Sequence, residues 1–186
     1  MAEGSIPAAA RECVSRYPLC FVASLHEDGS PNLSPKGTVR VWDADHLVFA
    51  DVASPQTVAN VGRDDRVHVN VVDHFARRGW RFTGRARVTD DPAVLQALRD
   101  EYPGEPYPFE QAVLVRVEDA RELVSPSYAL GKTEADLRRE YRELSDAPGA
   151  VPGALGVRAG IVCSGCERGA AGLDGLCDDC RAGRPA

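Results

Sequence analysis

The sequence predicts a mainly β protein with flanking helices, in which about six antiparallel strands form a barrel. Three observations support this fold class. Apolar and polar residues alternate along several stretches, which is typical of half-buried strands. Most of these stretches are joined by short turns, and two or three helical segments lie among them. A length of 186 residues is enough for one substantial domain plus an appendage.

The first predicted elements are a short helix over residues 7–16 and a strand over residues 19–25. Residues 26–29 supply turn chemistry, and the prolines after them favour extended backbone. This extended stretch carries four polar residues at alternate positions, which a strand places on one face: Ser34, Lys36, Thr38 and Arg40. Two cations and two hydroxyls on one face suit an anionic ligand, although polar alternation is also common on solvent-facing strands.

A second hairpin is predicted over residues 39–42 and 47–50, and a short helix follows it. Ser54 stands at the position that caps this helix, with Pro55 at its first helical position. A helix N-terminus has free N–H groups and the positive end of the helix dipole, so this one suits a phosphate group. The alternative interpretation is a helix cap with no ligand.

The later stretches complete the predicted barrel. Residues 66–73 and 79–89 alternate, and the second stretch places four polar residues on one face: Arg81, Thr83, Arg85 and Arg87. An amphipathic helix is predicted over residues 92–102, and the last long strand over residues 112–117, continuing towards Leu123. Strands in this order predict an antiparallel barrel with helices packed outside it.

Taken in order, these motifs resemble the FMN-binding split β-barrel family that is related to pyridoxamine 5′-phosphate oxidase. The similarity lies in a hairpin followed by DGSPNLSPKG, VFAD, a Ser-led helix, RVHVNVV and GWRFTGRARV, and it extends through about Val124. It implies a six-stranded antiparallel split barrel over residues 1–124. It also implies a homodimer with flavin at the subunit interface.

In that family, basic and hydroxyl residues on the second strand and at the start of the short helix hold the flavin phosphate. The matching positions, with one arginine from the strand after the basic turn, are Ser34, Lys36, Arg40, Ser54, Gln56, Thr57 and Arg81. Many relatives carry a basic pair where this chain has Pro55 and Gln56, so charge-assisted phosphate contacts of about 1.5–3 kcal/mol each are missing here. The arginine-rich C-terminal motif that pyridoxamine phosphate oxidases use for their substrate has no counterpart, so vitamin B6 oxidation is not predicted.

Members of this superfamily bind FMN, the deazaflavin F420 or haem. The resemblance therefore implies FMN as the cofactor, with F420 as the alternative. We predict a flavin-dependent oxidoreductase that acts on a small-molecule substrate, with no catalytic residue assigned. The alternative function is a non-catalytic sensor of flavin or F420, or an interaction module whose tail recruits a partner.

The net charge of −6, from 22 basic and 28 acidic residues, argues against non-specific binding to nucleic acid or to anionic membranes. No apolar run approaches the length of a membrane span, and the first residues lack the pattern of a signal peptide. We therefore expect a cytoplasmic protein with no nucleic-acid or membrane partner.

Three segments are predicted after the barrel: a helical extension over residues 125–144, a linker over residues 145–160, and a zinc-ribbon-like tail over residues 161–186. In the first of these, Thr133 and Asp136 approximate a capping box. The tail carries two C-x-x-C motifs separated by ten residues, and its candidate metal ligands are Cys163, Cys166, Cys177 and Cys180. Four thiolates suit one tetrahedral Zn²⁺ in a small metal knuckle. Iron in a rubredoxin-like site and two disulfides are the alternatives.

Overall fold

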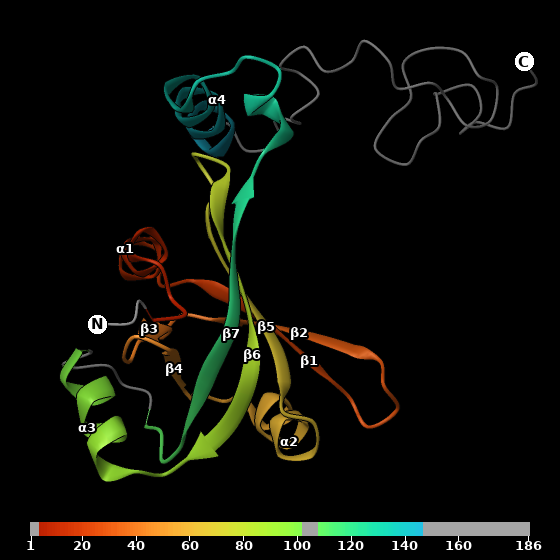
Figure 1. Ribbon diagram of the computed structural model, residues 1–186, viewed down its shortest axis with the longest axis vertical. Coiled ribbons are helices and arrows are strands. Elements are labelled where there is room, and N and C mark those ends of the chain that lie inside the picture. Colours follow the sequence, from red (N-terminus) through yellow and green to blue (C-terminus); the bar gives the residue numbers. More distant parts are fainter. Residues whose placement is uncertain (1–3, 102–107, 147–186) are drawn as a thin grey trace, which may run out of the picture. The chain divides into compact units, whose positions relative to one another are not determined.

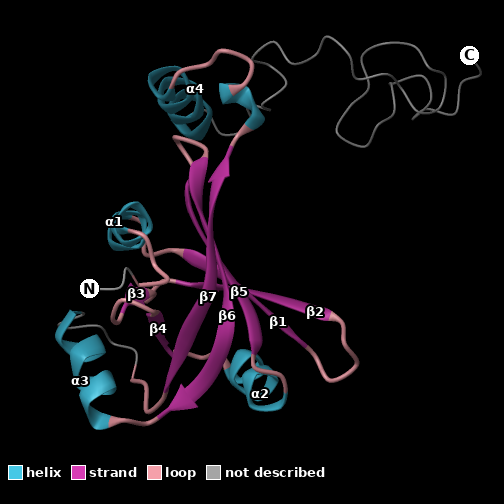
Figure 2. Cartoon of the chain, viewed as in Figure 1, coloured by secondary structure: helices cyan, strands magenta, loops and turns pink. Residues whose placement is uncertain are grey.

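A computed structural model describes residues 4–101 and 108–146 of the chain (Figure 1). As predicted, the described residues are mainly β, with one antiparallel sheet of seven strands and four α-helices (Figure 2). No helix among these residues is long and apolar enough to cross a membrane. In chain order the elements are α1 (Ala8–Arg16), β1 (Cys20–Leu25), β2 (Pro31–Lys36), β3 (Arg40–Val41), β4 (His46–Ala50), α2 (Pro55–Arg63), β5 (Arg66–Asp73), β6 (Arg78–Thr89), α3 (Pro92–Glu101), β7 (Ala112–Val124), the 3-10 helix η1 (Pro126–Tyr128) and α4 (Glu134–Asp146).

The chain divides into two units, Met1–Lys132 and Thr133–Ala186. The first unit contains the sheet, the helices α1 to α3 and η1, and the described part of the second contains α4. The start of α4 has the predicted cap. Thr133 Oγ1 donates to Asp136 Oδ2 at 2.6 Å, and the backbone N–H of Asp136 donates to Thr133 Oγ1 at 3.2 Å. These bonds satisfy groups that the first turn of a helix would otherwise leave unpaired.

The strands follow the order β2-β1-β5-β6-β7-β4-β3, so β2 and β3 form the two edges of the sheet. Only residues 37–39 connect these two edge strands. Such a short connection spans at most about 14 Å, whereas the edges of a flat seven-stranded sheet would lie about 29 Å apart. The sheet must therefore curl until its edges approach each other, and β2 and β3 do not pair, which agrees with a split barrel.

The prediction of six strands was wrong by one for the described residues, because the polar stretch after the first hairpin is broken. β2 ends at Lys36 and β3 begins at Arg40, with the fully buried Val39 between them. The hydroxyl of Thr38 accepts a hydrogen bond from the backbone N–H of Ala50 at 3.0 Å, at the end of β4. The four polar residues that were predicted to share one face are thus divided between the two edges of the sheet.

The inner face of the curled sheet holds the main core. β5 and β6 place Val67, Val69, Val71 and Phe82 inside, each no more than 2% exposed, which confirms the predicted alternation of both strands. The segment around α1 and the helix α2 add further buried apolar side chains: Ile6, Ala10, Val14 and Val61. Each apolar side chain that is fully buried in this way contributes about 1.5–3 kcal/mol to stability.

The outer face of the sheet is covered on one side and exposed on the other. α3 packs over Val48 and Ala50 of β4, which are 1% and 2% exposed. Phe21 on β1, Leu33 on β2 and Val72 on β5 are instead 43%, 66% and 36% exposed. Because β1 pairs with both β2 and β5, these three residues form one exposed apolar surface, which we call the outer patch.

Candidate functional site

Lys36, at the end of β2, is the centre of the candidate site. The residue is only 6% exposed, and its Nζ donates to Ser34 Oγ at 2.6 Å and to Ser54 Oγ at 2.8 Å. Ser34 lies two residues earlier on the same face of β2, and Ser54 immediately precedes α2. Among the described residues, no carboxylate oxygen lies within 4.0 Å of this ammonium group. Lys36 is therefore a buried cation whose hydrogen-bond partners are neutral hydroxyls.

Burial lowers the pKa of Lys36 from its ordinary value, because removal from water disfavours the charged amine. Cys20, which faces Lys36 directly across the β1–β2 pair, and Asp51 act in the opposite direction with smaller effect. Burial also raises the pKa of the Cys20 thiol to about 12, although the nearby Lys36 lowers it. Both groups are buried, with Lys36 6% and Cys20 0% exposed, so this corner of the barrel disfavours an uncompensated charge.

The start of α2 meets Lys36 at Ser54. Ser54 occupies the N-cap position, as predicted, but its side chain makes no capping hydrogen bond. Its hydroxyl instead donates to the carbonyl of Val52 at 3.1 Å and accepts from Lys36. The preceding Ala53 has a φ of 49°, in the left-handed region that is unfavourable for alanine, and this turn leads the chain from β4 into α2. The first N–H groups of α2 therefore lack a side-chain cap and remain available to an anion.

The structure separates Arg40 from this cluster. Arg40 Nε forms an ion pair with Glu101 Oε2 at the end of α3, and Arg40 Nη1 donates to the carbonyl of Val39 at 2.6 Å. The Arg40 side chain is only 20% exposed, so this pair is partly shielded from solvent. Its charge is thus already matched by a carboxylate within the chain.

Arg81 lies on the opposite face of the sheet from Lys36. In the strand register, Lys36 faces Cys20 and Cys20 faces Val71, all on the inner side. Arg81 instead faces Asn70 on the outer side, and its Nε donates to Asn70 Oδ1 at 3.1 Å. Within one chain, Arg81 therefore cannot contact a group that is bound at Lys36.

The two remaining predicted residues lie in the first turn of α2. Gln56 is exposed, and its Nε2 donates to Asn60 Oδ1 one turn later at 2.7 Å. Thr57 is buried, with 2% exposure. The structure thus brings Ser34, Lys36 and Ser54 into direct contact and places Gln56 and Thr57 on the adjoining turn.

A buried polar network behind this turn was not predicted from the sequence. Asn60 is fully buried, its Nδ2 donates to Ser24 Oγ at 3.0 Å, and its Oδ1 accepts from Gln56 and from Arg63 Nη2 at 2.7 and 2.8 Å. Asn32 Nδ2 donates to the same Ser24 hydroxyl at 3.1 Å. Two features of the sequence could have indicated this network. Residues 56, 60 and 63 are spaced so that they share one face of a helix, and asparagine is disfavoured in a helix interior.

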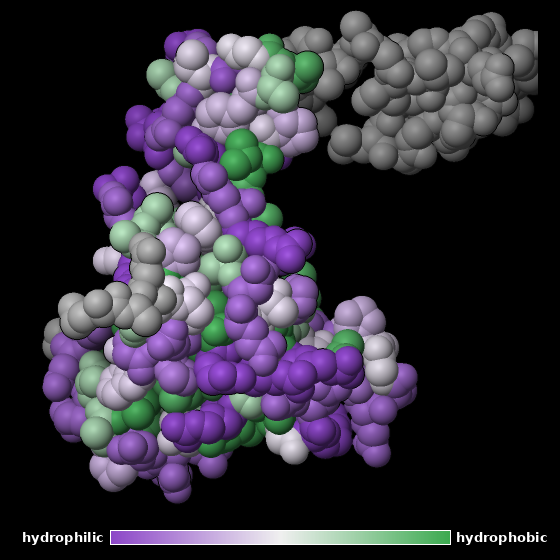
Figure 3. All heavy atoms as spheres, viewed as in Figure 1, coloured by the Kyte–Doolittle hydropathy of each residue, from purple (hydrophilic) through white to green (hydrophobic). Residues whose placement is uncertain are grey.

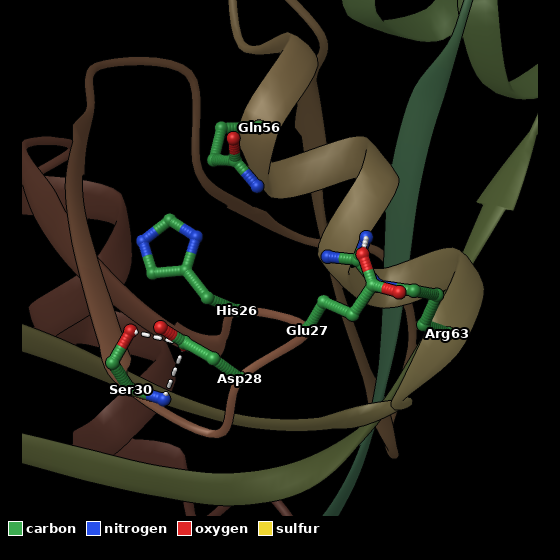
Figure 4. Close-up of a pocket in the computed structure, with 6 residues that line it drawn as sticks. All are labelled: His26, Glu27, Asp28, Ser30, Gln56 and Arg63. Carbon is green, nitrogen blue, oxygen red and sulfur yellow. Dashed lines mark hydrogen bonds and ion pairs between the residues drawn. The ribbon is translucent and has the colours of Figure 1, made fainter.

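An open pocket of about 700 Å³ lies between the turn of the β1–β2 hairpin and α2 (Figure 4). The side chains of His26 and Gln56 lie near each other from the two sides of the pocket, and Arg63 stands beside Glu27, with 3.6 Å between their charged groups. Asp28 Oδ1 accepts hydrogen bonds from the Ser30 hydroxyl and backbone N–H at 2.6 and 2.9 Å. Every lining residue is polar or charged, and Gln56 joins the pocket to the first turn of α2.

The described residues contain no group of three or more His, Cys, Asp or Glu side chains that could hold a metal ion. The predicted zinc ligands Cys163, Cys166, Cys177 and Cys180 lie outside the described residues. Cys13 and Cys20 are both free thiols, and burial raises the pKa of each.

The arrangement around Lys36 fits a phosphate group. It offers a buried cation, two hydroxyls and a helix N-terminus without a side-chain cap, and these are the groups that bind phosphate in proteins. A bound phosphate would bring a negative charge into direct contact with Lys36, where the described residues place no carboxylate within 4.0 Å.

Comparisons with known proteins are consistent with this fold. A family model described as pyridoxamine 5′-phosphate oxidase matches residues 6–123, more than half of the chain. Among solved structures, HupZ of Group A Streptococcus is similar with a TM-score of 0.59 and 24% identity, covering 64% of this chain and 95% of HupZ. No curated protein matches the sequence.

Two further proteins of similar structure have names that mention different cofactors. An FMN-binding protein from Syntrophomonas wolfei has a TM-score of 0.55 and 12% identity, covering 62% of this chain and 84% of its own. An F420 reductase has a TM-score of 0.52 and 21% identity, covering 62% of this chain and 98% of its own. At these identities the similarity establishes the fold alone.

Proposed function

The chain belongs to the pyridoxamine 5′-phosphate oxidase family, and on that basis we propose that it binds a flavin-type cofactor by its phosphate group. The observation that carries this proposal is the buried ammonium of Lys36, which contacts two serine hydroxyls and no described carboxylate. A buried charge without a counter-charge is costly, so such a group is best explained by an anion that arrives from outside. Each charge-assisted hydrogen bond to the phosphate would contribute about 1.5–3 kcal/mol.

FMN is the proposed cofactor, and F420 is the alternative. The names of two structurally similar proteins, an FMN-binding protein and an F420 reductase, support a cofactor of this kind. Lys36, Ser34, Ser54 and the first turn of α2, which contains Gln56 and Thr57, would hold the phosphate. Arg40 and Arg81, which the sequence also suggested, are engaged by Glu101 and Asn70.

A bound flavin would supply hydride or electron-pair transfer, and on this ground the proposed activity is that of an oxidoreductase acting on a small molecule. The residues of the chain would bind the phosphate and so fix the position of the cofactor. The contacts around Lys36 are suited to binding a cofactor. They do not identify a residue that would transfer a proton to a substrate. A non-catalytic flavin sensor or interaction module is therefore the second candidate. An enzyme should turn over a substrate when a reductant is supplied, and a sensor should not.

A homodimer is also proposed, with the outer patch of Phe21, Leu33 and Val72 as part of its interface. These side chains are 43%, 66% and 36% exposed, and contiguous apolar surface of this kind marks protein contacts. Replacing Leu33 by Asp should convert a dimer into a monomer, measured by light scattering after size-exclusion chromatography. Glu122→Gln, at an exposed position on β7, is the matched control and should leave the mass unchanged.

A zinc ion is proposed for the C-terminal cysteines, on sequence spacing alone. Cys163, Cys166, Cys177 and Cys180 would supply four thiolates to one tetrahedral ion. Elemental analysis of the full chain should find one zinc per chain, and Cys163→Ser with Cys177→Ser should remove it. Iron at the same stoichiometry would contradict the zinc assignment and favour a rubredoxin-like site.

The flavin proposal is tested by the absorption spectrum of the purified full chain and by titration with FMN. We expect the bands of oxidised flavin, or saturable uptake of added FMN. Lys36→Ala should weaken FMN binding at least tenfold, which corresponds to about 1.4 kcal/mol. Arg121→Ala, at an exposed position of β7, is the control, and this variant should bind FMN as tightly as the wild type does. A wild-type protein that takes up neither FMN nor F420 would contradict the proposal.

A further inference from the structure

The phosphate of FMN carries more charge than the candidate site of one chain matches. A phosphate monoester, with a second pKa of about 6, carries close to two negative charges at pH 7.5. Lys36 supplies one full positive charge, and the N-terminus of α2 adds about half of one. Arg40 is paired with Glu101. Because Lys36 is buried, unmatched charge beside it is costly, and tight binding requires a second cation from outside this cluster.

Arg81 is a cation on the outer face of the sheet that has a neutral partner. Its Nε donates to the amide oxygen of Asn70, and the described residues place no carboxylate in contact with it. The outer-face arginines Arg85 and Arg121 each lie 2.7 Å from a carboxylate oxygen of the chain. Arg81 therefore has a charge that its own chain leaves unmatched, and it lies on the wrong face to use that charge at its own Lys36.

One cross-strand row connects Arg81 to the strand that carries Lys36. In the pairing register Arg81 faces Asn70, and Asn70 faces Phe21 of the outer patch. Phe21 in turn faces Pro35, the residue before Lys36. Three strand spacings, or about 14 Å, separate the two ends of this row, and its middle lies beside Phe21. The outer patch is thus flanked by Arg81 on one side and by the strand of the phosphate site on the other.

A second copy of the chain on the outer patch would bring the two ends of this row together. Identical subunits are most often related by a two-fold axis, so that each contributes the same surface. An axis through the middle of the row places the partner's Arg81 opposite Pro35. The free edge of β2 is a poor alternative for adding a copy, because Pro31 and Pro35 have no N–H to pair with a further strand.

We propose that Arg81 of the partner subunit is the second cation of the phosphate site and reaches the phosphate at Lys36 past the edge of β2. β2 is an edge strand that does not pair with β3, so no further strand closes this side of Lys36 (Figure 1). The inference rests on the proposed function, since it requires a flavin phosphate at Lys36 and a homodimer through the outer patch. It goes further in naming the residue that each subunit contributes to the site of the other.

A phosphate-specific role of Arg81 is tested by titrating the full chain with FMN and with riboflavin at pH 7.5. Arg81→Ala should weaken FMN binding at least about tenfold, for the loss of one charge-assisted contact, and leave riboflavin binding within about twofold. Arg81→Lys, which keeps the charge, should recover part of the lost affinity. Arg121→Ala, at the position that faces Arg81 on β7, is the matched control and should bind FMN as tightly as the wild type does.

A mixed dimer shows which subunit supplies Arg81. Chains with Lys36→Ala and chains with Arg81→Ala are produced together with two different affinity tags, and dimers that carry both tags are isolated. In such a dimer, Lys36 of one chain and Arg81 of the other form one complete site, and the second site lacks both cations. The mixed dimer should therefore bind one FMN with wild-type affinity, although neither parent variant does.

The outcomes separate this inference from the proposed function. If Arg81→Ala binds FMN as the wild type does, or if the mixed dimer has no site of wild-type affinity, the inference is overturned and phosphate recognition by Lys36 stands. Equal losses for FMN and riboflavin would assign Arg81 a structural role and would also overturn the inference. If the wild type binds FMN no more tightly than riboflavin, phosphate recognition at Lys36 is overturned and the inference falls with it.

Discussion

Lys36 and the arginines of β6 and β7 are cations in opposite surroundings. Arg78, Arg85 and Arg121 are between 43% and 78% exposed, and each lies 2.7 Å from a carboxylate oxygen of the chain. Hydrophilic side chains cover much of the face that Figure 3 shows. Lys36 is 6% exposed and contacts two serine hydroxyls, with no described carboxylate within 4.0 Å.

The difference in exposure and pairing indicates different roles: the arginines form ion pairs at the surface, whereas Lys36 is available to bind a ligand. An exposed ion pair is screened by water and contributes little to stability, so the surface arginines can be exchanged at low cost. A buried ammonium with no counter-charge lowers stability, and the chain gains nothing from it unless an anion binds. The following predictions test whether Lys36 and the surface arginines differ in this way.

The largest effect is expected for Lys36→Met, which replaces the buried cation by an apolar side chain of similar length. In the absence of ligand, the free energy of unfolding should stay equal or rise by up to about 4 kcal/mol, because a desolvated charge is removed. Phosphate-dependent flavin binding should be lost in the same variant. Urea unfolding of the two proteins measures the first effect, and a large loss of stability would show that Lys36 has a structural role.

Asn60→Ala should give the next largest effect, in the opposite direction. The substitution leaves the buried Ser24 without a hydrogen bond from Asn60 and releases Gln56 and Arg63. The free energy of unfolding should fall by about 0.5–1.5 kcal/mol for each buried hydrogen bond lost, because Ser24 keeps the bond from Asn32. Asn70→Ala, which removes a hydrogen bond to the exposed Arg81, is the control and should change stability much less. Equal effects in the two variants would remove the distinction between buried and exposed polar contacts.

The pH dependence of stability reports on the pair of Cys20 and Lys36. The pKa of Cys20 rises from 9.0 to about 12 on folding, so between these values the unfolded chain loses a proton that the folded chain keeps. The free energy of unfolding should therefore fall as pH rises above 9, by about 1.4 kcal/mol per pH unit from this group. Cys20→Ala should reduce this fall, as measured by urea unfolding between pH 8 and pH 11.

Lys36 acts with the opposite sign over the neighbouring range. Its pKa is lowered on folding, so below the ordinary value of 10.5 the unfolded chain holds a proton that the folded chain loses. Stability from this group rises as pH increases towards 10.5. Lys36→Met should therefore make the alkaline fall in stability steeper than in the wild type. An unchanged slope would contradict the lowered pKa.

Arg121→Ala should have the smallest effect. Its side chain is 78% exposed and pairs with Asp119, which is 45% exposed. The free energy of unfolding should change by less than about 1 kcal/mol, and flavin binding should not change. A loss of flavin binding in this variant would show that the surface arginines contribute to the site and would undo the comparison with Lys36.

Much of the fold followed from local patterns. Alternation predicted which faces of β5 and β6 are buried, because the period of a strand depends only on neighbouring residues. The same period placed Ser34 and Lys36 on one face, and the Ser-Pro pair marked the start of α2. The strand count of about six was one too low, although a second hairpin beginning at residue 39 was predicted. The alternation of residues 31–41 does not show that β2 and β3 lie at opposite edges of one sheet.

The sequence by itself determined the residues of an anion site: a lysine and a serine on one strand face, and a serine before a helix. Only the tertiary structure decided which cations share that site. Arg40 meets Glu101 across 61 residues, Asn60 meets Ser24 across 36 residues, and Arg81 lies on the far face of the sheet. These contacts depend on how the sheet curls and where its edges approach each other. Local periodicity carries no information about that closure, so the structure was needed to show that Lys36 is the cation left for a ligand among the predicted site residues.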